Sequence, residues 1–365
     1  MLTSYQLEEI TACLPEYYPI GAVRSLMPMH YPVLDPTLAA AGSNVFRVDA
    51  QLGVFCLKRH RTGKPLSRIQ FEQDLQCKIS EAARNMVPDP MKTINGSSHF
   101  SIDEDWFRLE RFVQSQHHAW WRQDWNADDC GTAGLALRQF HRLTQRFLQQ
   151  APDWLPISGT ACGAGNGAYV SGFGPLGSSV AHSMSVALVQ ARAGMTSSNP
   201  QFSAAVLECI EACSELLARS QRLVAELPEP AKMLLVHGDY HPGNLLFAGE
   251  ELKGLVDFEH VHMEEPLFDV GYAALMFATN WTEPPGQTHD FNSEFLTALL
   301  EGYGDIDGQA IGADSLAKHL VTACILVASW LLARCPVWQA DNRMPLDCLE
   351  HVLGCWRRSL GQVGC

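Results

Sequence analysis

Three oxygen-bearing side chains stand at short intervals in one stretch of the chain: Asp239, Asn244 and Asp257. Between the last two, a pair of short apolar runs flanks a turn at Ala248–Glu251, which predicts a hairpin. The hairpin would bring Asn244, just before its first strand, beside Asp257, which follows its second strand, and the upstream loop would deliver Asp239. Carboxylate and amide oxygens without a His/Cys cage suit Mg²⁺, which substrate phosphates usually complete. The stretch therefore indicates phosphoryl transfer.

The spacing of this trio sharpens the interpretation. Asn244 follows Asp239 by five residues and Asp257 follows Asn244 by thirteen, which are the separations of the catalytic-loop Asp and Asn and the metal-binding Asp of protein kinases. The strings HGDYHPGNLL, VDFE and PLFDVGY resemble the aminoglycoside phosphotransferase, choline kinase and homoserine kinase-like superfamily, in which His-Gly-Asp replaces the protein-kinase His-Arg-Asp. The resemblance is strong over residues 234–271 and weaker upstream.

The resemblance implies a role for each residue around the trio. Asp239 orients the acceptor hydroxyl and takes its proton, and Asn244 and Asp257 hold Mg²⁺. His237 and Asp269 brace the loop from behind. A further loop residue, His241, is interpreted as a brace rather than a catalyst.

Upstream residues resemble the nucleotide-binding parts of the same superfamily. Lys58, at the end of a predicted strand, resembles the lysine that contacts the α and β phosphates, and Glu72 the helix glutamate that pairs with it. No GxGxxG string precedes the first strand pair, so Ser43 and Asn44, after Gly42, are the residues expected in the turn above the nucleotide.

The stretch from Glu110 to Val113 resembles the hinge of the superfamily. Its backbone would bind the adenine of ATP, with Glu110, Phe112 and Val113 as the residues involved.

Acidic residues dominate the motif region. Residues 237–270 hold eight acids and one base, so a naked triphosphate would be repelled and Mg²⁺ must accompany it. Three of these acids are candidates for the substrate side: Glu259, Glu264 and Glu265. Residues 1–116 hold 13 acids and 12 bases, whereas residues 117–365 hold 27 acids and 14 bases. This asymmetry favours nucleotide on the first part and a cationic acceptor on the second.

The resemblance implies a two-lobed protein-kinase-like fold, and the predicted elements agree with an α+β class. Alternating residues over 45–57 predict two antiparallel strands, 67–84 a helix, and 99–113 further strands. Residues 1–113 are therefore expected to form a small β-rich lobe that binds the nucleotide. Residues 114–365 are expected to form a larger, mainly helical lobe that contains the catalytic loop 237–244 and the metal-binding Asp257.

One segment of the second part has an unusual composition. Residues 157–198 begin with a run rich in glycine, and no charged residue occurs from Trp154 to Ala191. Composition favours a disordered insert over a mobile lid. The most apolar stretch, Leu320–Ala333, is shorter than the roughly 20 residues that a bilayer needs, so we expect a buried core helix there.

The net charge of −14 excludes a nonspecific grip on nucleic acid or anionic lipid. The first residues lack the basic and apolar regions of a secretory signal, so we expect a cytoplasmic location. The sequence thus predicts a kinase that transfers the γ-phosphoryl group of MgATP to a hydroxyl of a small, amine-bearing molecule such as an aminoglycoside, an amino alcohol or a homoserine-like compound. The alternatives are a nucleotide-binding pseudokinase, a kinase that acts on a protein or a glycated amine, and a nucleotidyl transferase.

Overall fold

The structure is a computed structural model of the 365-residue chain. It describes these residues: 4–29, 44–60, 64–116, 118–119, 124–150, 176–194, 199–225, 233–281, 291–306, 310–335, 338 and 342–362.

The chain forms two compact units. Unit 1 comprises residues 1–117, 153–156 and 245–259, and unit 2 comprises residues 118–152, 157–244 and 260–365. Residues 245–259, which include Asp257, therefore belong to unit 1, although the sequence suggested that they fold with the helical part.

Unit 1 is built on a five-stranded antiparallel sheet with the strand order β1-β2-β3-β5-β4. The strands β2 and β3 are the two predicted over 45–57, although β3 continues three residues further, to His60. The bounds of the strands are Val23–Pro28 for β1, Val45–Ala50 for β2, Gly53–His60 for β3, Phe100–Ile102 for β4 and Asp105–Arg111 for β5.

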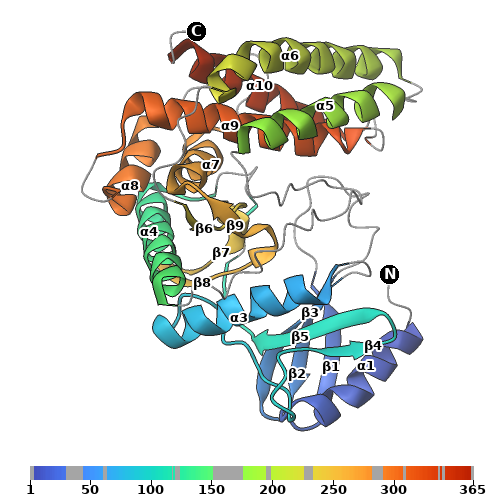
Figure 1. The fold of residues 1–365 in the computed structure, drawn as a ribbon. Coiled ribbons are helices and arrows are strands. Elements are labelled where there is room, and N and C mark those ends of the chain that lie inside the picture. Colours follow the sequence, from blue (N-terminus) through green and yellow to red (C-terminus); the bar gives the residue numbers. More distant parts are fainter. Residues whose placement is uncertain are drawn as a thin grey trace. The chain divides into compact units, whose positions relative to one another are not determined.

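A helix covers each face of this sheet (Figure 1). Helix α1 (Ser4–Tyr17) packs Ile10 and Leu14 against Phe55 and Leu57 of β3 in the main hydrophobic core of the unit. Because side chains alternate along a strand, Lys58 belongs to the other face.

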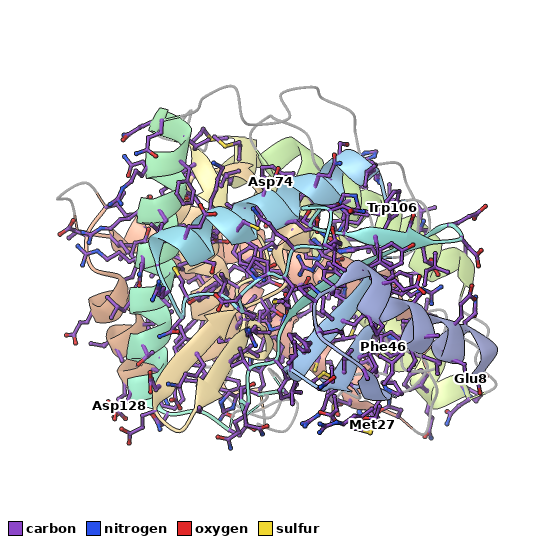
Figure 2. The ribbon with its side chains drawn as sticks, turned by 90° about the horizontal axis from the view of Figure 1, so that it is seen from below. Glu8, Met27, Phe46, Asp74, Trp106 and Asp128 are labelled. Atoms are coloured by element: carbon purple, nitrogen blue, oxygen red, sulfur yellow. The ribbon has the colours of Figure 1, made fainter. Side chains whose placement is uncertain are left out.

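Helix α3 (Leu66–Ala82) lies on the face of the sheet opposite to α1 (Figure 1). It buries Ile69, Leu75 and Ile79, and Gln76 Nε2 donates a hydrogen bond to Glu110 Oε2 of β5 at 2.9 Å. Figure 2 labels Asp74, which α3 exposes to solvent. The helix predicted over 67–84 is thus present with nearly the expected bounds.

The predicted hairpin after Asn244 is also present. Strands β7 (Leu245–Ala248) and β8 (Glu251–Leu255) pair antiparallel, with Leu245 opposite Leu255. Two backbone hydrogen bonds join the hairpin to the rest of unit 1, from Gln116 N to Phe247 O and from Leu255 N to Met86 O. These bonds explain why the hairpin folds with the N-terminal sheet.

Unit 2 is mainly helical, with one short antiparallel ribbon of β6 (Leu234–Val236) and β9 (His262–Glu264). Its helices are α4 (Ala127–Gln150), α5 (Leu176–Gly194), α6 (Pro200–Ala225), α7 (Pro266–Ala278), α8 (Ser293–Tyr303), α9 (Ala313–Leu332) and α10 (Met344–Gln362).

Two of these helices bear on the predictions. The described part of the 157–198 segment is largely helix α5 rather than an irregular insert, because Met184, Leu188 and Ala191 recur at helical spacing and are buried. The glycine-rich residues before α5 lie outside the described residues. Helix α9 is long and apolar enough to cross a membrane, but 78% of its most apolar window is buried in the protein, as expected of a core helix.

Candidate active site

The loop with Asp239 begins at the end of β6. This strand is wholly buried, and the chain leaves it through His237 and Gly238. Gly238 has a φ of +80°, and a Cβ at this position would collide with the carbonyl oxygen of His260. Glycine is therefore required between His237 and Asp239, which gives a physical reason for the His-Gly-Asp string.

Asp269, on the first turn of α7, holds this loop through its backbone. One carboxylate oxygen accepts the His237 N–H at 2.6 Å and the other accepts the Gly238 N–H at 2.9 Å. The side chains of Asp269 and His237 are fully buried. The geometry is that of a brace behind the loop.

Asp269 has a third partner, His141, to which the motif resemblance gave no role. His141 Nε2 on α4 lies 3.0 Å from Asp269 Oδ2, and His141 Nδ1 lies 2.9 Å from the hydroxyl of Tyr303 on α8. Burial alone would raise the pKa of Asp269, but the hydrogen bond and charge of His141 and the charge of His237 hold it below the ordinary value. A buried histidine in an apolar helix face needs a polar partner, and this need is the signal that could have identified His141.

The Asp239 carboxylate is held from two sides. The hydroxyl of Tyr272 on α7 donates a hydrogen bond to Asp239 Oδ1 at 2.8 Å, and Asn244 Nδ2 lies 3.3 Å from Oδ2. Tyr272 lies three residues after Asp269 and therefore on the same side of α7. Its role could not be read from the motif, because the contact depends on the placement of the helix. The Asp239 side chain keeps 16% of its surface exposed.

Asn244 and His241 shape the end of the loop. Asn244 Nδ2 donates to the Asp239 carbonyl oxygen at 2.8 Å, so the amide nitrogen faces the loop and the amide oxygen is left for another ligand. His241 Nδ1 accepts the Gly243 N–H at 3.0 Å, and His241 Nε2 lies 3.5 Å from Asp239 Oδ2. The contacts of His241 are those of a brace that also borders the carboxylate.

Unit 1 contains a second set of predicted residues around Lys58. Lys58 Nζ lies 2.9 Å from Asp257 Oδ1 and 3.2 Å from Glu259 Oε1. Burial alone would lower the pKa of Lys58, but these two carboxylates raise it well above the ordinary value. Asp257 has a left-handed backbone with φ +67°, which is uncommon for a residue other than glycine and clusters at functional sites.

The predicted pair of Lys58 with Glu72 is wrong. Glu72 has a side chain that is 1% exposed, and it pairs with Lys64 at 2.7 Å and with Arg68 at 2.9 Å. Lys64 lies just before α3 and Arg68 lies one turn before Glu72. Both cations are therefore near enough to pair with Glu72 in place of Lys58. The motif order could not reveal this competition, because it depends on which basic side chains surround the start of α3.

The structure describes part of the predicted nucleotide turn and all of the predicted hinge. Ser43 lies outside the described residues, and the Asn44 carbonyl accepts the Arg59 N–H at 2.7 Å. In the hinge stretch, the Phe112 N–H donates to Val54 O at 3.1 Å. Its amide is therefore engaged within the sheet.

Glu110 and Val113 differ in their surroundings. The Glu110 side chain is buried against Gln76 of α3, whereas no hydrogen bond of the Val113 N–H occurs among the described residues. Within the predicted hinge, the Val113 N–H is thus a backbone donor that no described acceptor occupies.

The three substrate-side candidates separate between the units. Glu259 belongs to unit 1, beside Lys58. Glu264 is 7% exposed, accepts the Glu265 N–H at 3.0 Å, and burial raises its pKa to about 7. Glu265 lies 3.4 Å from Nε2 of His319 on α9.

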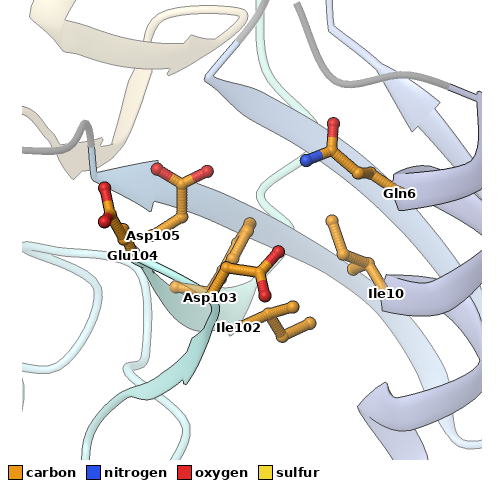
Figure 3. A pocket seen from close by; sticks show the side chains of 7 residues that line it. Gln6, Ile10, Ile102, Asp103, Glu104 and Asp105 are labelled. Carbon is orange, nitrogen blue, oxygen red and sulfur yellow. The ribbon is translucent and has the colours of Figure 1, made fainter.

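A cavity of about 530 Å³ in unit 1 lies between α1 and the turn that joins β4 to β5 (Figure 3), and none of the predicted site residues lines it. Apolar and acidic side chains and one amide line it together: Gln6, Ile10, Ile102, Asp103, Glu104, Asp105 and Phe107.

Asn244 of unit 2 and Asp257 of unit 1 each carry oxygen donors of the kind that a hard divalent cation prefers. Asn244 has an amide oxygen directed away from its hydrogen-bonded nitrogen, and Asp257 has a carboxylate that is 37% exposed. Oxygen donors of this kind suit Mg²⁺ better than softer transition metals. Among the described residues, no cluster of three His, Cys, Asp or Glu side chains could hold a metal ion.

Comparison with known proteins agrees with the fold and the motifs. The model of the family described as "Phosphotransferase enzyme family" matches residues 37–313. No curated protein matches the sequence.

Several solved structures are similar over nearly their whole length. A spectinomycin phosphotransferase, APH(9)-Ia, solved with ADP and spectinomycin, is 15% identical with a TM-score of 0.58, and the match covers 98% of this chain and 97% of that one. An amicoumacin kinase solved with AMP-PNP, Ca²⁺ and its substrate is 15% identical with a TM-score of 0.63, covering 96% and 93%. A microcompartment-associated aminopropanol kinase is 14% identical with a TM-score of 0.59, covering 98% of each chain. These likenesses confirm the protein-kinase-like fold.

Proposed function

This chain belongs to the phosphotransferase enzyme family, and on that premise we propose that it transfers the γ-phosphoryl group of MgATP to a hydroxyl of a small, amine-bearing molecule. The observation that carries the proposal is the Asp239 carboxylate, which Tyr272 and Asn244 hold while part of its surface stays exposed. A carboxylate fixed in this way can orient an acceptor hydroxyl and accept its proton.

The residues around Asp239 hold its loop in place before substrate binds. Asp269 fixes the backbone of His237 and Gly238, so the base need not be ordered when substrate arrives. Such preorganisation is a large part of phosphoryl-transfer catalysis, which depends mainly on positioning and electrostatics. Asp239 Oδ2 would take the proton from the acceptor hydroxyl as its oxygen attacks the γ-phosphorus in line, and ADP would leave.

Nucleotide binding is proposed for the residues of unit 1. Lys58 would exchange a carboxylate partner for the α and β phosphates, and the Val113 N–H would bind the adenine. Asn244 and Asp257 would hold Mg²⁺, which supplies charge neutralisation of the phosphates when bound. Similar proteins solved with ADP and AMP-PNP support nucleotide binding by this fold.

The acceptor is proposed to be cationic. Residues 117–365 hold 27 acids against 14 bases, so the part of the chain that contains Asp239 attracts positive charge. The names of similar proteins, spectinomycin phosphotransferase and aminopropanol kinase, are those of enzymes for small-molecule acceptors.

The test is release of ADP from MgATP in the presence of a panel of amino alcohols, homoserine, choline and aminoglycosides. We expect turnover with at least one cationic alcohol and its loss in Asp239→Asn, which should still bind MgATP. Silence across the panel, with MgATP still raising the melting temperature, would favour the pseudokinase alternative. Release of pyrophosphate in place of ADP would indicate nucleotidyl transfer, and a mass increase of added proteins would indicate a protein kinase.

A further inference from the structure

The carboxylates around Lys58 differ from the family pattern in one respect. Glu259, four residues after the end of β8, lies 3.2 Å from Lys58 Nζ, whereas Glu72 of α3 pairs with other cations. We propose that Glu259, and not Glu72, is the glutamate that positions Lys58 for the nucleotide phosphates. This inference rests on the proposed function, in which Lys58 contacts those phosphates.

Glu72 is committed to its own partners. Its two carboxylate oxygens are divided between Lys64 and Arg68, at 2.7 and 2.9 Å, and its side chain is 1% exposed. A move toward Lys58 would leave two cations without this buried carboxylate, and buried groups that lose their partners are costly. Glu72 therefore serves to fix the start of α3.

Glu259 is tied to α3 by two other contacts. Arg68 Nη2 donates to the Glu259 carbonyl oxygen at 3.0 Å, and Lys64 Nζ lies 3.6 Å from the same carboxylate oxygen that contacts Lys58. Arg68 thus contacts Glu72 and the Glu259 backbone, so the Glu259 segment is anchored to α3. The glutamate that contacts Lys58 thus comes from the segment after β8 and not from α3.

The two carboxylates on Lys58 have different prospects once nucleotide binds. Asp257 is the proposed metal ligand, so Mg²⁺ competes with Lys58 for its oxygens. Glu259 lies two residues later and has a second cation, Lys64, at its other side. Glu259 is therefore the partner that can stay with Lys58 when Asp257 turns to the metal. This role places Glu259 on the nucleotide side of the reaction and not on the acceptor side.

The experiment compares Glu259→Gln with Glu72→Gln in the intact enzyme, using the best acceptor from the panel. Glu259→Gln should raise the KM for MgATP about tenfold and leave the KM for the acceptor within about twofold. Glu72→Gln should lower the melting temperature but leave the KM for MgATP within about twofold. Glu251→Gln is the matched control, because Glu251 of β8 is 66% exposed and pairs with Lys253, so it removes the same charge without touching Lys58.

The opposite split would overturn the inference: an unchanged KM for MgATP in Glu259→Gln, or a rise equal to that in Glu251→Gln. If Glu72→Gln fails to fold, the comparison of Glu259→Gln with its control still decides the question. Lys58→Ala separates this failure from failure of the proposed function. If Lys58→Ala abolishes MgATP binding while Glu259→Gln does not change it, only the role of Glu259 is wrong.

Discussion

The two units hold their functional charges in different ways. In unit 1, Lys58, Asp257 and Glu259 are joined by ion pairs, and the two carboxylate side chains are 37% and 38% exposed. In unit 2, Asp269 is fully buried and accepts two backbone N–H groups besides its contact with His141. Partly exposed ion pairs contribute little free energy and exchange readily, whereas buried hydrogen-bonded carboxylates are costly to disturb.

This difference matches the two tasks of a kinase. In the proposed function, Lys58 gives up a partner each time a nucleotide enters, and partly exposed pairs allow this. The base must keep one orientation through every turnover, and a loop fixed by buried hydrogen bonds provides it. In this chain the contacts of the proposed nucleotide-binding residues are therefore more exchangeable, and those of the proposed base are more rigid.

The largest effect is expected when the buried carboxylate of Asp269 is removed. Asp269→Ala leaves the His237 and Gly238 N–H groups and His141 without their acceptor, and we expect a loss of about 3–5 kcal/mol in the free energy of unfolding together with most turnover. Chemical denaturation measures the loss. The control is Asp314→Asn on α9, whose pair with Lys318 is exposed and should contribute less than about 1 kcal/mol. Equal losses in the two variants would contradict the distinction between rigid and exchangeable contacts.

A smaller effect is expected from the pH dependence of Glu264. Burial raises its pKa to about 7 in the folded protein from an ordinary 4.5, so the folded state binds the proton more tightly than the unfolded state. The stability that protonated Glu264 contributes is complete below about pH 4.5 and is lost as the pH rises through 7, a change of about 3 kcal/mol. Glu264→Gln should remove this loss.

Melting temperatures at pH 5 and pH 8 check this expectation. The variant should gain stability relative to the parent as the pH rises between these values. A parent and a variant that differ by the same amount at both pH values would show that Glu264 does not titrate in this range.

The smallest effect should come from Tyr272→Phe, which removes one hydrogen bond to Asp239 and keeps the ring. We expect kcat to fall about tenfold, equivalent to about 1.4 kcal/mol, because the carboxylate loses one of the contacts that fix its plane. The KM values for MgATP and the acceptor should stay within about twofold, since Tyr272 contacts the base and not the nucleotide residues. A rise in KM with unchanged kcat would show that Tyr272 acts on binding.

The sequence predicted well what depends on local chemistry. The His-Gly-Asp string, the hairpin after Asn244 and the position of Lys58 on a strand follow from short-range spacing, turn residues and alternation. The order of strand and helix signals predicted the α+β class, whereas the protein-kinase-like fold was implied by the family resemblance of the motifs.

What the sequence could not show depends on tertiary competition. The pairing of Glu72 was wrong because Lys64 and Arg68 reach it before Lys58 does. Helix α5 was missed because the glycine run before it hid the apolar spacing of Met184 and Leu188. The contact of Tyr272 with Asp239 requires the placement of α7, which no local pattern encodes.

We propose that Lys58 of unit 1 binds nucleotide and that Asp239 of unit 2 acts as the base. The most direct test of these two roles compares Lys58→Ala with Asp239→Asn in two measurements on each protein. The melting-temperature shift on addition of MgATP reports nucleotide binding, and ADP release reports turnover. Lys58→Ala should lose the shift, whereas Asp239→Asn should keep the shift and lose turnover by a factor of about 10² to 10⁴. Loss of the MgATP shift in Asp239→Asn, with the shift preserved in Lys58→Ala, would contradict the account.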